Sequence, residues 1–158
     1  MRQLILLRHA HAEQASTGQA DFDRPLSPRG LAEAEAAGAW LAEQSLLPDR
    51  VLCSPARRTR ETLECVFDRI GYTEMRLEDT IYEATPGTLA ALLERHRDVE
   101  RVLVVGHNPG LERLAALLNS GRSGDYRGMP TAAVAVLGLP LETAIEPGAA
   151  RLAAFWWP

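Results

Sequence analysis

The feature that most constrains the fold of this chain is an apolar run near its start that ends abruptly in polar residues. The run is Leu4–Leu7, and Arg8 and His9 follow it directly. Four consecutive apolar residues indicate a buried strand. In an open α/β sheet, ligands bind beyond the carboxyl ends of the strands. A core strand requires neither an arginine nor a histidine at that point, so both are candidate site residues.

Segments with the pattern of strands alternate with segments that have the pattern of helices. The alternation predicts an α/β fold with three layers, α/β/α, around a mostly parallel sheet. The last two strands are expected to pair antiparallel at one side. The predicted strands are Gln3–Leu7, Arg50–Cys53, Met75–Glu78, Arg101–Val105, Thr131–Leu139 and Leu152–Trp157. Ser27 and Ser54 each precede a proline and are predicted to cap the first two helices.

Length, charge and cysteine content limit the number of domains, the partners and the location that can be expected. The 158 residues are expected to form a single domain, and the net charge of −4 argues against nucleic acid or an anionic membrane as partners. All 17 basic residues are arginine, so only unusually placed arginines count as evidence for phosphate binding. Cys53 and Cys65 match no zinc or CxxC spacing, and no segment resembles a signal peptide or a membrane span. A cytoplasmic location is therefore expected.

Polar groups follow three of the predicted parallel strands. Arg8 and His9 follow the first, Arg58 lies just beyond the second, and His107 follows the third. Because the carboxyl ends of parallel strands meet at one edge of a sheet, these groups are expected to converge although they are far apart in the sequence. That convergence is stronger evidence for a site than any one of the residues.

Arg57 and Arg58 occupy a position that is unfavourable for a cation. They lie in the first turn of a predicted helix, where the backbone dipole costs a cation about 0.3–1 kcal/mol. A cation that is placed in an unfavourable position without a local partner to compensate for it suggests a functional role. Arg57 has a simple explanation, since Glu61 one turn later can form an ion pair with it. Arg58 is therefore the stronger candidate.

The remaining two histidines are weaker candidates. His9 and His11 form a His-x-His pattern that also resembles the first metal ligands of some hydrolases. Such a site needs further His or Asp ligands, which the sequence does not supply, so no metal is predicted. His11 is expected at the rim of the site. His96 lies between two arginines at a predicted helix end and is expected to be solvated.

Two arginines, two histidines and a helix N-terminus suit the binding of a phosphoryl group without a metal. Phosphoryl transfer depends mainly on positioning and charge stabilisation, which guanidinium groups can supply. A neutral imidazole can attack phosphorus and form a phosphohistidine. A backbone carbonyl that accepts a hydrogen bond from the other ring nitrogen of His9 would fix the tautomer that this attack requires.

Three segments resemble signature motifs of the histidine phosphatase superfamily, in its phosphoglycerate-mutase-like branch. They are Leu6–Ala10, Ser54–Thr62 and Val105–Pro109. Two further segments, Arg24–Gly30 and Tyr82–Pro86, are similar to the SixA-type phosphohistidine phosphatases within it. The resemblance covers nearly the whole chain and implies a phosphoglycerate-mutase-like fold and a phosphatase that needs no cofactor. The family pattern often has Gly and Gln where this chain has Ala10 and Glu61.

The resemblance also implies roles for individual residues. His9 would be the nucleophile, and a phosphoryl group would be bound by Arg8, Arg58, His107 and Asn108. Glu83 lies in the region where many members place a proton donor. A phosphoramidate leaving group that is already protonated needs no such donor, so Glu83 is either a catalytic acid or an ordinary loop residue.

Short connections leave two segments to form a rim around the site, Ala12–Arg24 and Ser120–Pro130. An open cleft of this kind is expected to admit a phosphohistidine on a protein surface. The predicted partner is thus a phosphorylated protein or a small phosphomonoester, and the chain is expected to be a monomer or weak dimer. The alternatives are a small-molecule phosphomonoesterase of the same superfamily and a non-catalytic phospho-ligand binding module.

Overall fold

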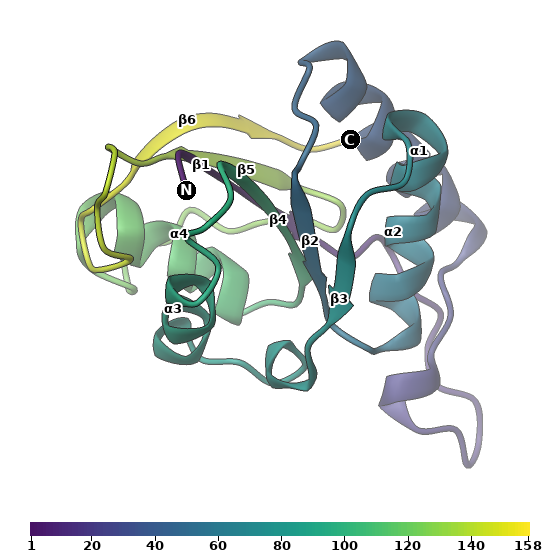
Figure 1. Ribbon diagram of the computed structural model, residues 1–158. Coiled ribbons are helices and arrows are strands. Elements are labelled where there is room, and N and C mark those ends of the chain that lie inside the picture. Colours follow the sequence, from purple (N-terminus) through teal and green to yellow (C-terminus); the bar gives the residue numbers. More distant parts are fainter.

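One six-stranded sheet with helices on both faces forms the centre of the molecule in the computed structural model, which describes residues 1–158 (Figure 1). The strand order is β3-β2-β4-β1-β5-β6. The first four in this order are parallel, and β5 pairs antiparallel with both β1 and β6. The antiparallel pairing of the last two strands at one side was predicted from the sequence. The strands are β1 (Gln3–Arg8), β2 (Arg50–Cys53), β3 (Met75–Leu77), β4 (Arg101–Gly106), β5 (Val134–Gly138) and β6 (Arg151–Trp156).

Two pairs of helices cover the sheet. α1 and α2 pack together on one face, and α3 and α4 pack together on the other, which confirms the predicted three layers. The helices are α1 (Pro28–Glu43), α2 (Arg57–Ile70), α3 (Pro86–Glu94) and α4 (Gly110–Ser120), with short 3-10 turns at Asp21–Asp23 and Asp79–Ile81. None of these helices is long and apolar enough to cross a membrane.

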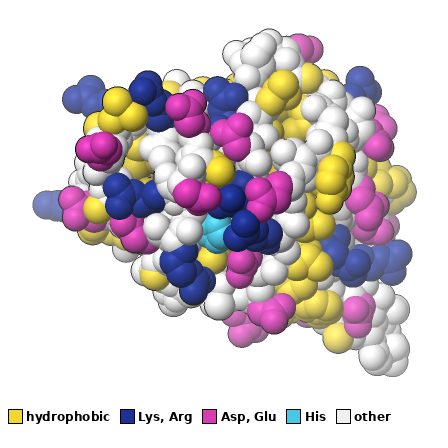
Figure 2. Space-filling model, in the orientation of Figure 1, with side chains coloured by type: hydrophobic (Ala, Val, Ile, Leu, Met, Phe, Trp, Pro, Cys, Tyr) yellow, Lys and Arg dark blue, Asp and Glu magenta, His cyan; other side chains and the backbone are white.

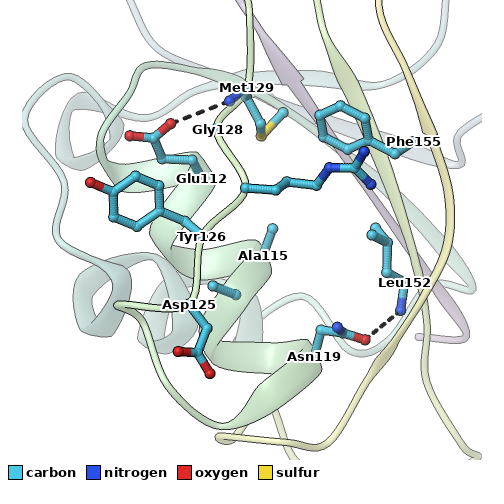
Figure 3. A pocket seen from close by; sticks show the side chains of 11 residues that line it. Glu112, Ala115, Asn119, Asp125, Tyr126, Gly128, Met129, Leu152 and Phe155 are labelled. Carbon is cyan, nitrogen blue, oxygen red and sulfur yellow. Dashed lines mark hydrogen bonds between the residues drawn. The ribbon is translucent and has the colours of Figure 1, made fainter.

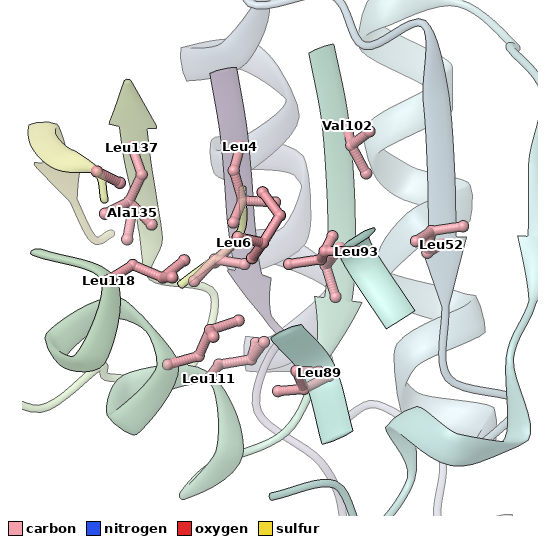
Figure 4. Close-up of a cluster of buried hydrophobic side chains, with 14 of the residues drawn as sticks. Leu4, Leu6, Leu52, Leu89, Leu93, Val102, Leu111, Leu118, Ala135 and Leu137 are labelled. Atoms are coloured by element: carbon pink, nitrogen blue, oxygen red, sulfur yellow. The ribbon is translucent and has the colours of Figure 1, made fainter. Parts of the chain in front are cut away.

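Alternating side chains of β1 supply both halves of the core. Leu4 and Leu6 belong to the cluster that α3 and α4 complete, where Leu93 and Leu111 meet them (Figure 4). Ile5 and Leu7 belong to the cluster beneath α1 and α2. Since successive strand residues point to opposite faces, β1 must be apolar throughout, and it is fully buried between its first and last residues. The core thus extends to the residue before Arg8.

The two predicted helix caps differ in outcome. The Ser27 side chain accepts a hydrogen bond from the Gly30 N–H at 3.0 Å, so it caps α1 as expected. The prediction for Ser54 is wrong. α2 begins at Arg57 and its N-cap is Ala56, which has no side-chain cap. The Ser54 hydroxyl instead lies 2.7 Å from the ring of His107, because β4 places that histidine beside it.

Glycines allow two close approaches near the carboxyl edge of the sheet. A Cβ on Gly30 would lie 1.9 Å from the carbonyl oxygen of His11, so α1 can pack against the segment after β1 only without a side chain there. A Cβ on Gly110 would lie 2.6 Å from the carbonyl oxygen of Ala84. Both contacts bring loops from different parts of the chain to the same edge.

The prediction that His96 is solvated is wrong. Only 5% of the residue is exposed, and its Nδ1 lies 3.2 Å from a guanidinium nitrogen of Arg50. Arg50 is itself buried at the start of β2 and pairs with Asp98 at 2.8 Å. The chain after α3 therefore turns back over the amino edge of the sheet. This places His96 at the opposite end of the sheet from Arg8 and His9.

Candidate active site

Four polar side chains from three segments meet at the carboxyl edge of the sheet. Arg8 ends β1 and His9 follows it, Arg58 is the second residue of α2, and His107 follows β4. The rings of His9 and His107 have centroids 5.3 Å apart, and Arg58 lies 3.4 Å from the second ring. The predicted convergence is confirmed. Figure 2 shows one face of the molecule, on which arginine and acidic side chains lie interspersed around a small patch of histidine.

Backbone contacts fix the position of His9. Its N–H donates to the carbonyl of Gly106 at 3.0 Å, and its carbonyl accepts from Ala132 at 3.1 Å, so it is held between β4 and the start of β5. Its ring Nδ1 lies 2.7 Å from the carbonyl oxygen of Ala10. A carbonyl can only accept, so Nδ1 carries the proton and Nε2 has a free lone pair. This is the tautomer that nucleophilic attack through Nε2 requires.

His107 has protein partners on both ring nitrogens. Nδ1 faces Arg58, which can only donate, so this nitrogen is the acceptor. Nε2 then carries the proton and donates to the Ser54 hydroxyl at 2.7 Å. An oxyanion could accept from Nδ1 only after this nitrogen gains a proton and leaves Arg58. While Nδ1 is unprotonated, the ring therefore offers an oxyanion no donor on the side that faces Arg58.

Burial and nearby cations keep both histidines neutral. Desolvation is the main cause that lowers the pKa of His9 to about 4, and the charges of Arg58 and Arg8 lower it further. Desolvation also lowers the pKa of His107 to about 3, with smaller contributions from His9 and Arg58. Both rings are thus uncharged at neutral pH. An uncharged His9 retains the lone pair that makes it a nucleophile.

Arg8 is anchored by neutral groups on one side of the site. Its Nη1 donates to the carbonyl of Met129 at 2.8 Å. Asn108 donates to the same carbonyl at 2.9 Å and to Glu112 at 3.1 Å, and Glu112 accepts from the N–H of Met129. The segment that contains Met129 is thus tied to α4. The side-chain N–H groups of Asn108 are both used in this anchoring.

Arg58 is anchored by a carboxylate on the other side. Its Nη1 and Nη2 donate to the carbonyl oxygen of Asp21 at 2.8 Å and to the Asp21 carboxylate at 3.0 Å. The Tyr82 hydroxyl donates to the same carboxylate oxygen at 2.5 Å. The Tyr82 ring packs edge-on against His107, with centroids 5.4 Å apart. Asp21 therefore connects Arg58 to the aromatic wall of the site.

The Nε–H groups of Arg8 and Arg58 are buried and have no hydrogen-bond partner in the protein. An unpaired buried donor costs about 1–3 kcal/mol, and more when it is charged. Both guanidinium groups belong to the set around His9. Unpaired charged donors of this kind favour the binding of an oxyanion.

A model of the histidine phosphatase superfamily, branch 1, matches residues 4–95. Rv1276c, an uncharacterised protein of Mycobacterium tuberculosis, is 39% identical over 162 residues that cover 96% of this chain and 99% of that protein. The phosphohistidine phosphatase SixA of Escherichia coli is 32% identical over 127 residues, or 77% of this chain and 76% of SixA. A crystal structure of SixA from Agrobacterium tumefaciens superposes with a TM-score of 0.86 at 32% identity, covering 99% and 98% of the two chains.

The chain belongs to the histidine phosphatase superfamily, branch 1. Its six-stranded, mostly parallel sheet with flanking helices is the phosphoglycerate-mutase-like fold, and at full length it is SixA-like. The family match includes the segments that contain Arg8, His9 and Arg58 and ends before β4. The structure itself brings His107 to the three others.

Glu83 and His11 lie at the margins of this superfamily site. Glu83 is exposed and lines a pocket of about 380 Å³ together with His107, Asn108 and Arg113, without an ion-pair partner. His11 is half-buried, and its Nδ1 lies 2.7 Å from the hydroxyl of Ser27. Its place at the rim stays a prediction. No three His, Cys, Asp or Glu side chains among residues 1–158 are grouped to hold a metal ion.

A second pocket, of about 440 Å³, lies beside the Arg8 anchor (Figure 3). It is enclosed by α4, by the loop that leads to Met129, and by β6. Glu112 lines it and accepts the hydrogen bond from Met129 that Figure 3 shows. Arg127 lies over the ring of Phe155, 4.1 Å from its centroid. The same loop therefore borders a pocket and holds Arg8.

Sequence reasoning missed three polar residues that orient the predicted ones. Asp21 holds Arg58, Ser54 holds His107, and Thr62 accepts a hydrogen bond from the N–H of Ala10 at 3.0 Å. Ser54 and Thr62 lie within the motif that led to Arg58, so their proximity to the site could have been inferred. Asp21 carried no comparable signal, because it belongs to a polar loop whose path depends on tertiary packing.

Arg57 forms its ion pair with Glu61 at 3.2 Å on the surface, as predicted. Both rim segments also reach the site. Ala12–Arg24 contributes Asp21, and Ser120–Pro130 contributes the carbonyl of Met129. The rim is thus attached to the two arginines rather than merely close to them.

Proposed function

We propose that this chain is a metal-independent phosphatase that hydrolyses phosphohistidine on proteins through a covalent phospho-His9 intermediate. The observation that carries the proposal is the neutral ring of His9, with its Nδ1–H bound to the Ala10 carbonyl and its Nε2 free, beside Arg8, Arg58 and His107. A nucleophile and cationic donors at one strand edge form the minimum set for phosphoryl transfer.

In the first step, the lone pair of His9 Nε2 forms a bond to phosphorus. The bond to the leaving group breaks, and its electron pair goes to the leaving group. The His9 ring now carries a positive charge, which the hydrogen bond from Nδ1–H to the Ala10 carbonyl stabilises. In the second step, water attacks phosphorus, the phosphorus–nitrogen bond breaks, and phosphate and neutral His9 are released.

Arg8, Arg58 and His107 bind the phosphoryl oxygens in this proposal. The two guanidinium groups provide the unpaired Nε–H donors, and His107 donates through Nδ1 once it takes up a proton. Asn108 acts differently. Because its side-chain donors bind Met129 and Glu112, it contributes by positioning the carbonyl that holds Arg8.

Glu83 has a restricted role as a proton donor. Its carboxyl group borders the pocket beside His107, where a leaving group can be accommodated. When the ring of a phosphohistidine is protonated, the histidine departs as a neutral imidazole and needs no further proton. The alkoxide that departs from an alkyl phosphate ester does need one. Glu83→Gln should therefore slow hydrolysis of alkyl esters while leaving phosphohistidine turnover little changed.

The choice of phosphohistidine is supported by the SixA of Escherichia coli, which is a phosphohistidine phosphatase by name and 32% identical. It is also supported by the rim, where two short segments border the site. The alternative is a small phosphomonoester substrate with the same chemistry at His9. A cytoplasmic location, with a phosphorylated protein as partner, is part of the proposal.

The test is to compare turnover in EDTA of a phosphohistidine peptide with that of a phosphoserine peptide, a sugar phosphate and a nucleotide. We expect the phosphohistidine peptide to have the highest kcat/KM and His9→Ala to lose turnover by orders of magnitude. Faster turnover of a small phosphomonoester would contradict the substrate assignment. Binding of phosphate without turnover of any substrate by the wild type would indicate a binding module.

A further inference from the structure

Asp21 places a carboxylate within the group of cations that surrounds His9. Its Oδ2 accepts hydrogen bonds from Arg58 at 3.0 Å and from the Tyr82 hydroxyl, and its Oδ1 accepts from Arg24 at 2.9 Å. The Asp21 side chain is 54% exposed, whereas Arg58 and His107 are buried. Asp21 therefore lies at the mouth of the site, between solvent and the buried arginine.

Carboxylates also lie close to the other arginine. The negative charges of Glu112 and Glu33 act on Arg8. Glu33 is held by the N–H of His11 and the hydroxyl of Thr131, and Glu112 is held by the loop at Met129. Arg24 also binds Asp21, so three carboxylates face three guanidinium cations while His9 and His107 are neutral. A site without a net positive charge has little electrostatic preference for ligands of high negative charge.

Asp21 cannot supply a proton at neutral pH. The hydrogen bond from Tyr82 is the main cause that lowers the pKa of Asp21 to about 2, and the Arg58 charge acts in the same direction. The group is therefore ionised throughout the physiological range. A carboxylate in this state can only accept hydrogen bonds or attract positive charge.

We propose that Asp21 is a specificity-determining residue that favours a phosphoryl group carried on a cationic imidazolium over one carried on a neutral or anionic ester. The proposal rests on the proposed function, since it concerns the leaving group that departs when His9 attacks. A phosphohistidine has one ring nitrogen bonded to phosphorus and can carry a proton on the other. A carboxylate at the mouth of the site attracts the charged ring and raises its pKa.

The chemical consequence follows from the fate of the electron pair. When the phosphorus–nitrogen bond breaks, the pair goes to the ring nitrogen, and the imidazolium becomes a neutral imidazole that keeps its other proton. Asp21 increases the fraction of bound substrate in this reactive, protonated form. An ester has no such proton, and its extra negative charge is repelled by the same carboxylate.

The experiment compares Asp21→Asn with the wild type on a phosphohistidine peptide and on p-nitrophenyl phosphate. Asparagine keeps an acceptor oxygen for Arg58 but removes the charge. We expect kcat/KM to fall for the peptide and to rise for the ester, so that their ratio changes about tenfold, as expected for one nearby charge in a partly exposed site. The pH above which peptide turnover declines should also shift downward in the variant.

Asp23→Asn is the matched control. It removes the same charge from the same turn, but the Asp23 side chain makes no hydrogen bond or ion pair to the site. The ratio of the two kcat/KM values should stay within about twofold of the wild type, since exposed charges without partners interact weakly. An equal change in Asp23→Asn and Asp21→Asn would contradict a specific role for Asp21.

Other outcomes separate the possible explanations. If Asp21→Asn slows both substrates by the same factor, Asp21 only positions Arg58, and if it accelerates both equally, Asp21 only competes with phosphate. Either result would overturn this inference and leave the proposed function intact. If the wild type hydrolyses the ester but not the phosphohistidine peptide, both proposals fail together.

Discussion

Arg8 and Arg58 serve the same site, yet the protein holds them with groups of different charge. Arg8 donates to a carbonyl of the Ser120–Pro130 segment, and Arg58 donates to a carbonyl and to a carboxylate of the Ala12–Arg24 segment. A carbonyl orients a guanidinium without neutralising it, whereas an ionised carboxylate compensates part of its charge. Both arginines thus have carboxylates nearby, but only Arg58 is bound directly by one, so its charge is compensated at closer range.

Removal of each arginine should give the largest effects and should distinguish the two sides. Arg8→Ala should lower kcat/KM about 10²–10³-fold, which is typical for the loss of a donor to a transition-state oxyanion. Arg58→Ala should cost more, because it also removes one of the two cations that bind the Asp21 carboxylate. Addition of Asp21→Asn to Arg58→Ala should then recover part of the loss, measured with p-nitrophenyl phosphate. Equal losses and no recovery would remove the distinction.

The two histidines between these arginines should make the protein sensitive to acid. Their folded-state pKa values of about 4 and about 3 lie below the usual 6.5, so the unfolded chain binds more protons between these limits. The free energy of unfolding should therefore fall as the pH falls from about 6.5 to 4, with a slope of up to about 2.7 kcal/mol per pH unit for two protons.

Urea denaturation across this range measures the slope, and a His9→Gln/His107→Gln double variant is the comparison. The pKa of His96 is also lowered by burial, so the variant should retain a shallower slope of the same sign. An unchanged slope in the double variant would show that neither site histidine is buried in its neutral form.

Thr62 links the segment after β1 to the first turn of α2, and its replacement should have an effect on activity between those of Arg58→Ala and Arg57→Ala. Its hydroxyl donates to the carbonyl of Arg58 at 2.7 Å and accepts from the N–H of Ala10. Thr62→Val leaves that buried N–H unpaired, which should destabilise the protein by about 1–3 kcal/mol. It should also lower kcat, since Ala10 orients the His9 ring. Thr62→Ser retains the hydroxyl and should preserve most of the stability and most of kcat. Equal losses of stability and kcat in Thr62→Val and Thr62→Ser would argue against this hydrogen bond.

Arg57 should have the smallest effect and serves as the reference for its neighbour Arg58. Its ion pair with Glu61 is exposed, and such pairs contribute about 0.2–1 kcal/mol at most. Arg57→Ala should therefore leave kcat/KM within about twofold of the wild type and change stability by less than about 0.5 kcal/mol. A loss similar to that of Arg58→Ala would mean that the general charge of this helix end, rather than Arg58 itself, serves the site.

The residues that could be predicted from the sequence are those whose position depends on the sheet. Arg8, His9 and His107 follow strands directly, so the parallel order of β1 and β4 brings them together. The alternation of strand and helix patterns likewise predicted the layers of the fold. Even the Ala10 carbonyl that orients His9 could be anticipated in kind, because the required tautomer needs an acceptor beside the ring.

The residues that could not be predicted depend on loops and on side-chain packing. Asp21 reaches Arg58 only through the path of a polar loop, and Ser54 turns to His107 instead of capping α2. His96 was expected in solvent because its neighbours are charged, but the chain after α3 folds it against Arg50. In each case a long-range contact outweighed a local preference that the sequence does show.

The most direct test of the account is to quench the enzyme during turnover of a ³²P-labelled phosphohistidine peptide in EDTA and to examine the label on the protein. We predict a label that is acid-labile and base-stable, as phosphohistidine is, that maps to His9, and that is lost in His9→Ala. A base-labile label, or a label that persists in His9→Ala, would contradict the central claim that His9 is the nucleophile.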